Sequence, residues 1–321
     1  MKQPMQTASG SLSSTLGEQD QVISRRQALA CGLTRAALEH RIRPDGPWRR
    51  LLPGVYMAQT GEPTVTQKEM AALLHAGPES VLTGPAALWA LGISNEEPAT
   101  FDVLVPTSRR PASVAFVVIH RTARMPDVVI PRGRRSYAAA PRALADTARR
   151  MTDLREVRAL IAGAIQRRAC PLGALVFELG EGGRQHSALL RQVLDEASEG
   201  IRSVAEGELR DLIERAGLPM PVFNPRLCTA DGVFIASPDA WWADAGVAAE
   251  IDSRERHLSP ADWEETMRRH DAMIRHGILL LHFSPAQVRR EPTVVAATIT
   301  DALNAGRARE PLPVIARPAS S

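Results

Sequence analysis

The sequence predicts an α/β chain, α+β overall, in which a helical N-terminal module precedes a mixed middle region and a C-terminal mixed sheet flanked by helices. Residues 24–56 combine two short helices around a glycine turn with two short strands. Residues 101–196 pass from strand-like to helical patterns, and residues 237–285 alternate acid-tipped strands with a capped helix. At 321 residues and 44% apolar content, the chain is long enough for more than one core.

The N-terminal pattern predicts a winged helix-turn-helix. Ser24 begins a capping box, a turn follows at Gly32, and Thr34 caps a second helix that ends near residue 42. Residues 48–56 then predict two short strands joined at Pro53-Gly54, in the position of a wing.

Five arginines lie where such a module meets DNA: Arg25 and Arg26 at the first helix, Arg35 at the second, and Arg49 and Arg50 in the wing. The planar guanidinium group forms paired hydrogen bonds with phosphate or guanine. We therefore predict these five as DNA-binding residues and double-stranded DNA as a partner. The pattern leaves one alternative open, a solvated basic helical pair that contacts no DNA.

The middle region predicts strands and helices without a catalytic cluster. The expected strands are residues 101–105, 114–120 and 128–130, and the expected helices are residues 141–151, 154–169, 173–179 and 186–196. Two further helices, residues 66–76 and 83–91, are expected in the N-terminal region after the wing. Residues 106–111 form a basic loop, and further arginines follow it at Arg121, Arg124, Arg132, Arg134 and Arg135. A run of charge usually marks a solvated face, so we interpret this region as a structural or interaction segment that adds phosphate contacts.

The C-terminal pattern centres on acids at the end of an apolar strand, residues 247–252. Alternation along a strand places Glu250 and Asp252 on one face, and a short hairpin brings Asp239 alongside them. Converging carboxylates are what a hard cation such as Mg²⁺ requires. The sequence therefore predicts Asp239 and Glu250 as Mg²⁺ ligands, with polar strand ends as the simpler alternative.

A capped helix and a buried strand follow these acids. Ser259 is the expected N-cap, Gly277 ends the helix, and residues 278–283 predict a central strand covered by helices on both faces. The helix carries an apolar stripe at Trp263, Met267, His270 and Ile274. Because His270 lies on this stripe and His282 on the strand, we interpret both as packed core histidines rather than zinc ligands.

This C-terminal segment resembles the PD-(D/E)xK endonuclease superfamily, in the branch close to very-short-patch-repair endonucleases. The matching residues are Pro238-Asp239, Glu250-Ile251-Asp252, His257, Arg268, Arg269 and Asp271 on the helix, the strand 280–283, and Glu206 upstream. The resemblance implies an Mg²⁺-dependent nuclease fold whose catalytic residues are Asp239, Glu250, Asp252, His257 and Glu206. Asp252 occupies the position of the motif lysine, which makes His257 the substitute for that lysine.

The N-terminal segment resembles a second family. The stretches ISRRQALACGLTRAALEHRI and WRRLLPGVYM, together with residues 81–89, are similar to the N-terminal domain of AbiEi-type antitoxins. The resemblance covers residues 21–93 and implies a winged helix that binds promoter DNA. It also implies a following domain that supports dimerisation or neutralises a toxin, so a second copy of the chain and a cognate toxin protein are the further expected partners.

Charge, cysteine content and apolar runs indicate which partners and which cellular compartment to expect. The net charge of +3 and the isoelectric point near 9.0 are compatible with nucleic-acid binding. Cys31, Cys170 and Cys228 form neither a metal-binding pair nor an even disulfide set, which fits a reducing cytoplasm. The sequence has no apolar run of membrane-spanning length and no signal-peptide core, so we expect a cytoplasmic protein. Nucleotide-binding glycine loops, HExxH and GxSxG are all absent.

These predictions divide the chain into five parts. They are a disordered tail (1–19), the winged helix-turn-helix (20–95), a mixed middle domain (96–199), the endonuclease-like domain (200–305) and a second disordered tail (306–321). Two functions follow: a DNA-binding regulator or antitoxin with a non-catalytic endonuclease-like domain, or an active Mg²⁺-dependent DNA endonuclease addressed by its winged helix. The two differ in whether Asp239, Glu250 and Asp252 converge with His257 on one cation.

Overall fold

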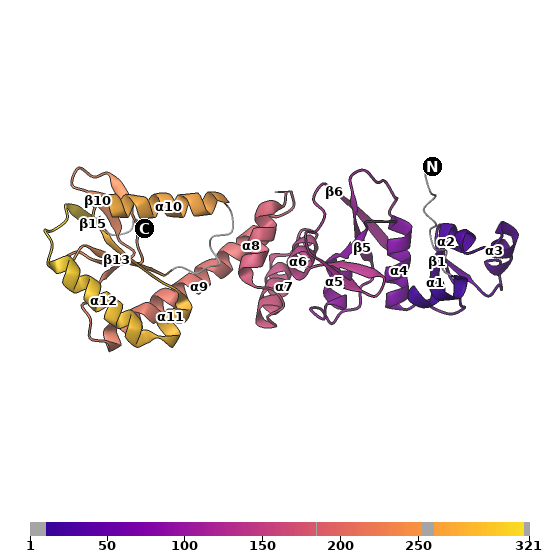
Figure 1. The fold of residues 1–321 in the computed structure, drawn as a ribbon, viewed down its shortest axis with the longest axis horizontal. Coiled ribbons are helices and arrows are strands. Elements are labelled where there is room, and N and C mark those ends of the chain that lie inside the picture. Colours follow the sequence, from indigo (N-terminus) through magenta and orange to yellow (C-terminus); the bar gives the residue numbers. More distant parts are fainter. Residues whose placement is uncertain (1–10, 184, 252–259, 318–321) are drawn as a thin grey trace, which may run out of the picture. The chain divides into compact units, whose positions relative to one another are not determined.

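The structure is a computed structural model that describes residues 11–183, 185–251 and 260–317. It divides into two compact units, one formed by the described residues up to Pro171 with Gly182–Leu190, the other by Leu172–Glu181 with the described residues from Arg191. Both units combine helices with sheets of mixed or antiparallel strands, so the predicted α+β class is confirmed (Figure 1). None of the described helices is both long and apolar enough to cross a membrane.

The first unit begins with the element order of a winged helix-turn-helix. Its elements are α1 (Leu12–Glu18), β1 (Val22–Ser24), α2 (Arg25–Ala30), α3 (Arg35–Arg41), β2 (Arg49–Leu52) and β3 (Val55–Met57). The three strands form an antiparallel sheet in the order β1-β3-β2. Its core is built from Leu16, Ile23, Ala28, Leu38, Trp48 and Tyr56. The hairpin β2-β3 is the wing.

Helix α1 corrects the predicted disordered tail. Ser11 caps this helix by accepting a hydrogen bond from the Ser14 backbone N–H at 3.1 Å, and Leu16 is buried in the core. The tail prediction was drawn from the polar composition and is wrong for Leu12–Glu18, because one buried leucine ties the segment to the core. The part of that tail from 1 to 10 lies outside the described residues.

The rest of the first unit is an α/β layer. Its elements are α4 (Val65–Ala76), β4 (Val81–Thr83), α5 (Gly84–Ala90), β5 (Phe101–Pro106), β6 (Val117–Thr122), β7 (Val129–Arg132), β8 (Arg135–Ala138), α6 (Ala140–Ala148) and α7 (Leu154–Gln166). The five strands run in the order β6-β5-β4-β8-β7. The predicted boundary at 95/96 is wrong, because β4 pairs with both β5 and β8 and so belongs to this sheet.

Helices α8 (Leu172–Glu181) and α9 (Ala188–Arg215) correct a second boundary. The predicted boundary at 199/200 falls inside α9, which continues through Gly200 for 28 residues in all. Glycine in a helix interior is unfavourable by about 1 kcal/mol relative to alanine, but it does not by itself end a helix. The Glu199-Gly200 pair was therefore a poor boundary signal.

The second unit contains two sheets, ordered β14-β13-β12-β9 and β11-β10-β15. Its remaining elements are β9 (Val222–Phe223), β10 (Arg226–Thr229), β11 (Phe234–Ala236), β12 (Ala240–Trp242), β13 (Val247–Ile251), α10 (Pro260–Arg275), β14 (Leu279–Phe283), α11 (Pro285–Arg290), α12 (Pro292–Arg307) and β15 (Val314–Arg317). Strands β13 and β14 are parallel, whereas β12 pairs with β13 antiparallel.

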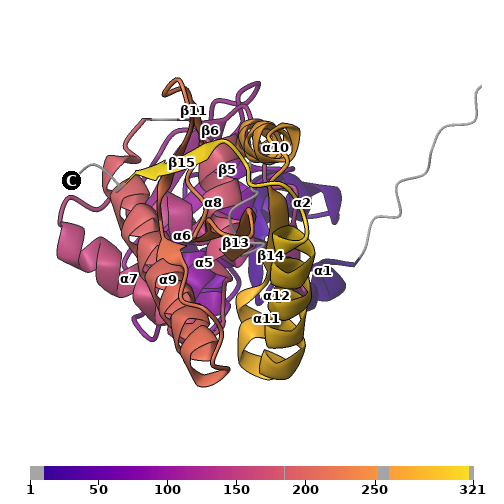
Figure 2. The same cartoon turned by 90° about the vertical axis from the view of Figure 1, so that its left-hand side faces the viewer.

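The central strand β13 has two differently covered faces. Val247, Ala249 and Ile251 pack with residues of α9, α11 and α12, whereas Ala248 packs with Met273 of α10 and with strands β10 and β11. Helix α10 accordingly lies on the opposite side of β13 and β14 from α11 and α12 (Figures 1 and 2). The face that carries Ala248 also carries Glu250, because side chains alternate along a strand.

Two further predictions are wrong for the C-terminal elements. Strand β14 was expected at the centre of a sheet, but it pairs only with β13 and lies at the sheet edge among the described residues. The second disordered tail was expected from residue 306, yet α12 ends at Arg307 and β15 pairs with β10 through Val314–Arg317. The apolar side chains of β15 cover one core, and this contact overrides the proline-rich composition.

Candidate functional site

The winged helix carries the first candidate site, a set of exposed arginines. The Ser24 hydroxyl accepts a hydrogen bond from the Gln27 backbone N–H at 3.3 Å, and the Gln27 side chain accepts one from the Ser24 N–H at 3.0 Å. The Thr34 hydroxyl caps α3 by accepting a hydrogen bond from the Ala37 backbone N–H at 3.1 Å. These caps fix the first turns of α2 and α3. All five predicted DNA-binding arginines are exposed: Arg25, Arg26, Arg35, Arg49 and Arg50.

The arginines of the wing differ from those of the helices in their contacts. Arg49 donates hydrogen bonds to the Gly61 carbonyl at 2.7 Å and to the Glu62 carboxylate at 2.8 Å. The Arg50 guanidinium lies 6.0 Å from the centre of the Tyr56 ring. In contrast, the side chains of Arg25, Arg26 and Arg35 form no hydrogen bond or ion pair with any residue that the structure describes. These three cations are available to an external anion.

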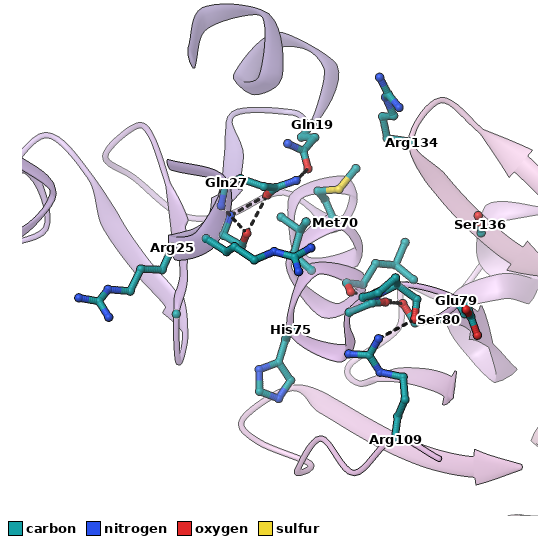
Figure 3. Close-up of a pocket in the computed structure, with 17 residues that line it drawn as sticks. Gln19, Arg25, Gln27, Met70, His75, Glu79, Ser80, Arg109, Arg134 and Ser136 are labelled. Atoms are coloured by element: carbon teal, nitrogen blue, oxygen red, sulfur yellow. Dashed lines mark hydrogen bonds between the residues drawn. The ribbon is translucent and has the colours of Figure 1, made fainter. Parts of the chain in front are cut away.

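A basic pocket of about 540 Å³ lies beside this arginine set, between α2 and α4 (Figure 3). Arg25 and Arg26 line it from α2, His75 from α4, and Arg109 and Arg134 from loops of the α/β layer. Arg109 donates a hydrogen bond to the Pro78 carbonyl at 3.1 Å. Arg134 forms an ion pair with Glu18, and its hydrogen bond lowers the pKa of that carboxyl.

Sequence reasoning did not connect Arg109 and Arg134 with the winged helix. It placed Arg109 in a basic loop and Arg134 on a solvated face, and nothing local in the sequence shows that α4 packs against β1, β2 and β3. This packing brings the loops of the α/β layer to the start of α2. The wider signal was the excess of arginine in both segments.

The second candidate site lies on the α10 side of β13. The paired residues Ala240 and Ala249 set the register of β12 and β13, so Asp239 comes opposite Glu250 one step beyond the last pair. On the other side of β13, Glu250 pairs with His282 of β14. Asp239, just before β12, therefore lies at a position beside Glu250 of β13, as the sequence predicted, and His282 of β14 lies on the other side of Glu250.

Glu250 is buried beside an arginine and a histidine. The residue is 3% exposed, and its Oε2 atom accepts hydrogen bonds from Arg269 at 3.0 Å and from the His270 Nε2 at 3.1 Å. Its other oxygen, Oε1, is buried and has no hydrogen-bond partner among the described residues. A buried carboxylate oxygen without a partner is unfavourable and indicates a missing ligand, water or ion.

The remaining predicted catalytic residues fall into two groups. The Asp239 Oδ2 atom accepts a hydrogen bond from the Ile251 backbone N–H at 2.8 Å. Glu206 accepts one from the Asn224 side chain at 3.0 Å, and the Asn224 backbone N–H donates to the Asp239 carbonyl at 3.1 Å. Glu206 is therefore connected to the Asp239 segment through Asn224. Asp252 and His257 lie outside the described residues.

The interpretation of the two histidines as core residues is wrong for His282. His282 is exposed rather than packed in a core, because β14 is an edge strand. The rings of His270 and His282 lie 4.4 Å apart between their centres. One ligand atom from each ring and one Glu250 oxygen all lie within 4.8 Å of one another. No sequence signal joined Glu250 to the two histidines, which follow it by 20 and 32 positions along the chain.

Comparison with known proteins finds two similar proteins, and both are named as uncharacterized. No protein-family model matches the chain. Two proteins of Mycobacterium tuberculosis, the uncharacterized proteins MT2308 of strain CDC 1551 and Rv2248 of strain H37Rv, are each 28% identical over 277 residues. Each alignment covers 86% of this chain and 99% of the relative. The similarity therefore includes most of both units.

Proposed function

We propose that this chain is a DNA-binding regulator of the AbiEi-antitoxin type, in which the winged helix binds duplex DNA and the C-terminal unit has an endonuclease-like fold. The observation that supports it best is the group of Arg25, Arg26 and Arg35, exposed at the starts of two capped helices and without partners among the described residues. Helix α3 is the counterpart of the recognition helix, whose N-terminal residues contact bases in the major groove.

The neighbouring cations extend this proposed contact surface. Arg50 in the wing and Arg109 and Arg134 at the pocket are positioned on the same unit as the helix arginines. Each phosphate neutralised by such a cation releases counterions, which makes affinity strongly dependent on salt. We place the protein in the cytoplasm and expect a cognate toxin or a second copy of the chain as further partners.

A second candidate function is Mg²⁺-dependent DNA cleavage. It is favoured by the neighbouring positions of Asp239 and Glu250 across the sheet and by the buried Glu250 Oε1. These two carboxylates fit a hard cation and would hold it, while Arg269 fixes the orientation of Glu250. A bound Mg²⁺ would activate a water molecule and offset charge on the phosphate. We rank this function second, because Asp252 replaces the motif lysine that would stabilise developing charge.

Fluorescence anisotropy with a duplex from the region upstream of the protein's own gene tests the proposed function. The wild-type chain is expected to bind this duplex in preference to an unrelated competitor, and Arg35→Ala is expected to weaken the binding. Arg155→Ala, at an exposed arginine on α7 outside the winged helix, is the matched control. Equal affinity of Arg35→Ala and Arg155→Ala would contradict the assignment of α3 as the DNA-contacting helix.

The same protein preparation tests the second function. Plasmid DNA is incubated with wild type and with Glu250→Gln in Mg²⁺ or Mn²⁺, and nicked and linear products are quantified. If the protein is a regulator without nuclease activity, wild type and Glu250→Gln give the same background level of nicked and linear plasmid. Metal-dependent cleavage that disappears in Glu250→Gln would instead establish the nuclease.

A further inference from the structure

We propose that Glu250, His270 and His282 form a binding site for a transition-metal ion of the Zn²⁺ class. The three side chains come from β13, α10 and β14, and their ligand atoms lie within 4.8 Å of one another. The inference depends neither on DNA binding nor on nuclease activity. It assigns Glu250 a different ion and different co-ligands from those of the Mg²⁺ site described above.

One of the three spacings between ligand atoms is close to that around a bound ion, and all three lie within 4.8 Å. Zn²⁺ binds histidine nitrogen and carboxylate oxygen at about 2.0–2.2 Å, so neighbouring ligand atoms of a tetrahedral site are about 3.3 Å apart. Glu250 Oε2 and His270 Nε2 are 3.1 Å apart. His282 stands beside Glu250 in the parallel pairing of β13 and β14 and is exposed.

Burial gives the second observation. The Glu250 side chain is 4% exposed, yet its Oε1 atom has no hydrogen-bond partner among the described residues. Arg269 and His270 both contact Oε2. An ion bound between His270 and the carboxylate would replace the hydrogen bond that joins them, and binding through both carboxylate oxygens would satisfy Oε1 as well. The Arg269 hydrogen bond also orients the carboxylate, as outer contacts of metal ligands commonly do.

The donor set selects the class of metal. Imidazole nitrogen suits Zn²⁺, Co²⁺, Fe²⁺ and related ions, whereas Mg²⁺ prefers oxygen ligands in an octahedron. Two histidines and one glutamate leave at least one position for water or for an oxygen of a bound molecule. A set of one carboxylate and two imidazoles therefore favours Zn²⁺ over Mg²⁺ at this place.

The test uses the full-length chain without an affinity tag, freed of metal with a chelator and then dialysed against Zn²⁺. Bound metal is quantified at equilibrium, and Co²⁺ serves as a spectroscopic probe of the ligand geometry. We expect one tight Zn²⁺ per chain, and Mg²⁺ in excess should not displace it. His282→Ala should weaken Zn²⁺ binding by about tenfold or more. Loss of a residue that only hydrogen-bonds to a metal ligand already lowers metal affinity by about 10- to 100-fold, and His282 is itself a proposed ligand.

Two controls separate the site from adventitious binding by the eight histidines of the chain. His276→Ala removes an exposed histidine that follows α10 and is not in the cluster, and it should bind Zn²⁺ as wild type does. Glu250→Gln keeps the side-chain volume while removing the charge and should weaken binding as His282→Ala does. Circular dichroism confirms that each variant folds; His282 is exposed, so His282→Ala decides the question if Glu250→Gln unfolds.

Two outcomes would overturn the proposal. One is Zn²⁺ binding that is absent, or is equal in His282→Ala and His276→Ala. The other is preferential Mg²⁺ binding that Glu250→Gln abolishes and His282→Ala leaves intact, because that result assigns Glu250 to the oxygen-ligand site of the second candidate function.

Discussion

On the winged helix, Arg25, Arg26 and Arg35 are exposed and have no side-chain partner among the described residues, whereas Glu250 of the C-terminal unit is 3% exposed and bonded to Arg269 and His270. Exposed charges keep their hydration and remain available to a large polyanion. A buried carboxylate loses its hydration and must be compensated by fixed cations or an ion. The first arrangement suits binding over an extended surface, and the second suits a small site with defined geometry.

The largest expected effect comes from removing the exposed arginines together. Arg25→Ala/Arg26→Ala/Arg35→Ala should weaken duplex binding by about a hundredfold or more, since each good arginine contact is worth about 1–3 kcal/mol. If all three contact phosphate, the slope of log K against log salt should fall in magnitude by about 2.7. Anisotropy titrations over a series of salt concentrations measure both quantities. Retention of the wild-type slope would show that this charge set does not face DNA.

For the buried carboxylate of Glu250, we expect a substitution to reduce stability. Glu250→Ala leaves Arg269 and His270 without their acceptor and should lower the unfolding free energy of the C-terminal unit by about 2 kcal/mol. This loss of stability is smaller than that for breaking a fully buried ion pair, because the Arg269 side chain is 35% exposed and therefore partly hydrated. Hydrogen exchange of peptides covering β13 and β14 measures this change. Glu264→Ala, an exposed acid on α10, is the control, and an equal result for both variants would argue against a compensated cluster.

Local rules in the sequence were sufficient for the winged helix. Capping residues and the glycine turn act over three or four positions, so Ser24, Thr34 and the wing defined α2, α3 and β2-β3 directly. The placement of Asp239 opposite Glu250 was also predictable, because a short hairpin joins their strands. In both cases the deciding interactions are close in sequence.

Features that depend on distant contacts were missed. Strand β8 has the polar sequence Arg-Ser-Tyr-Ala, and pairing with β4 and β7 is what makes it a strand. Leu16 secures α1 only because a core lies beneath it. His270 and His282 reach Glu250 through the packing of α10 on a parallel strand pair, which no local pattern in the sequence could show.

Glu69 of α4 is a second buried carboxylate, and it can be compared with Glu250. It is 1% exposed, accepts a hydrogen bond from the Tyr137 hydroxyl at 2.7 Å and lies 3.4 Å from Arg135. Burial is the main cause that raises its pKa above the ordinary value, although Tyr137 and Arg135 oppose the shift. Between the unfolded and folded pKa values the folded state binds more protons, so its stability falls as the pH rises through that window.

Glu69→Gln should therefore stabilise the first unit at neutral pH and remove this fall with pH, by less than the effect expected for Glu250→Ala. The amide resembles the protonated acid and still accepts from Tyr137. Urea denaturation at several pH values from the acidic to the neutral range tests this, with the exposed Glu156→Gln on α7 as the control. A destabilised Glu69→Gln variant at neutral pH would show that the Arg135 ion pair outweighs burial, which would make Glu69 more like Glu250.

The smallest expected effect concerns Arg49, the wing arginine that already has a partner. Its side chain donates to the Glu62 carboxylate at 2.8 Å, and the Glu62 side chain is 87% exposed. Exposed ion pairs contribute only about 0–1 kcal/mol, so under the proposed function this pair would compete only weakly with DNA for Arg49. Glu62→Gln removes that competition and one negative charge from the wing, and should raise duplex affinity by about threefold or less. The gain should shrink at high salt because both effects are screened. Arg49→Ala in the Glu62→Gln background should cancel the gain; a gain that survives this second change would mean that Glu62 repels DNA directly and that Arg49 does not reach it.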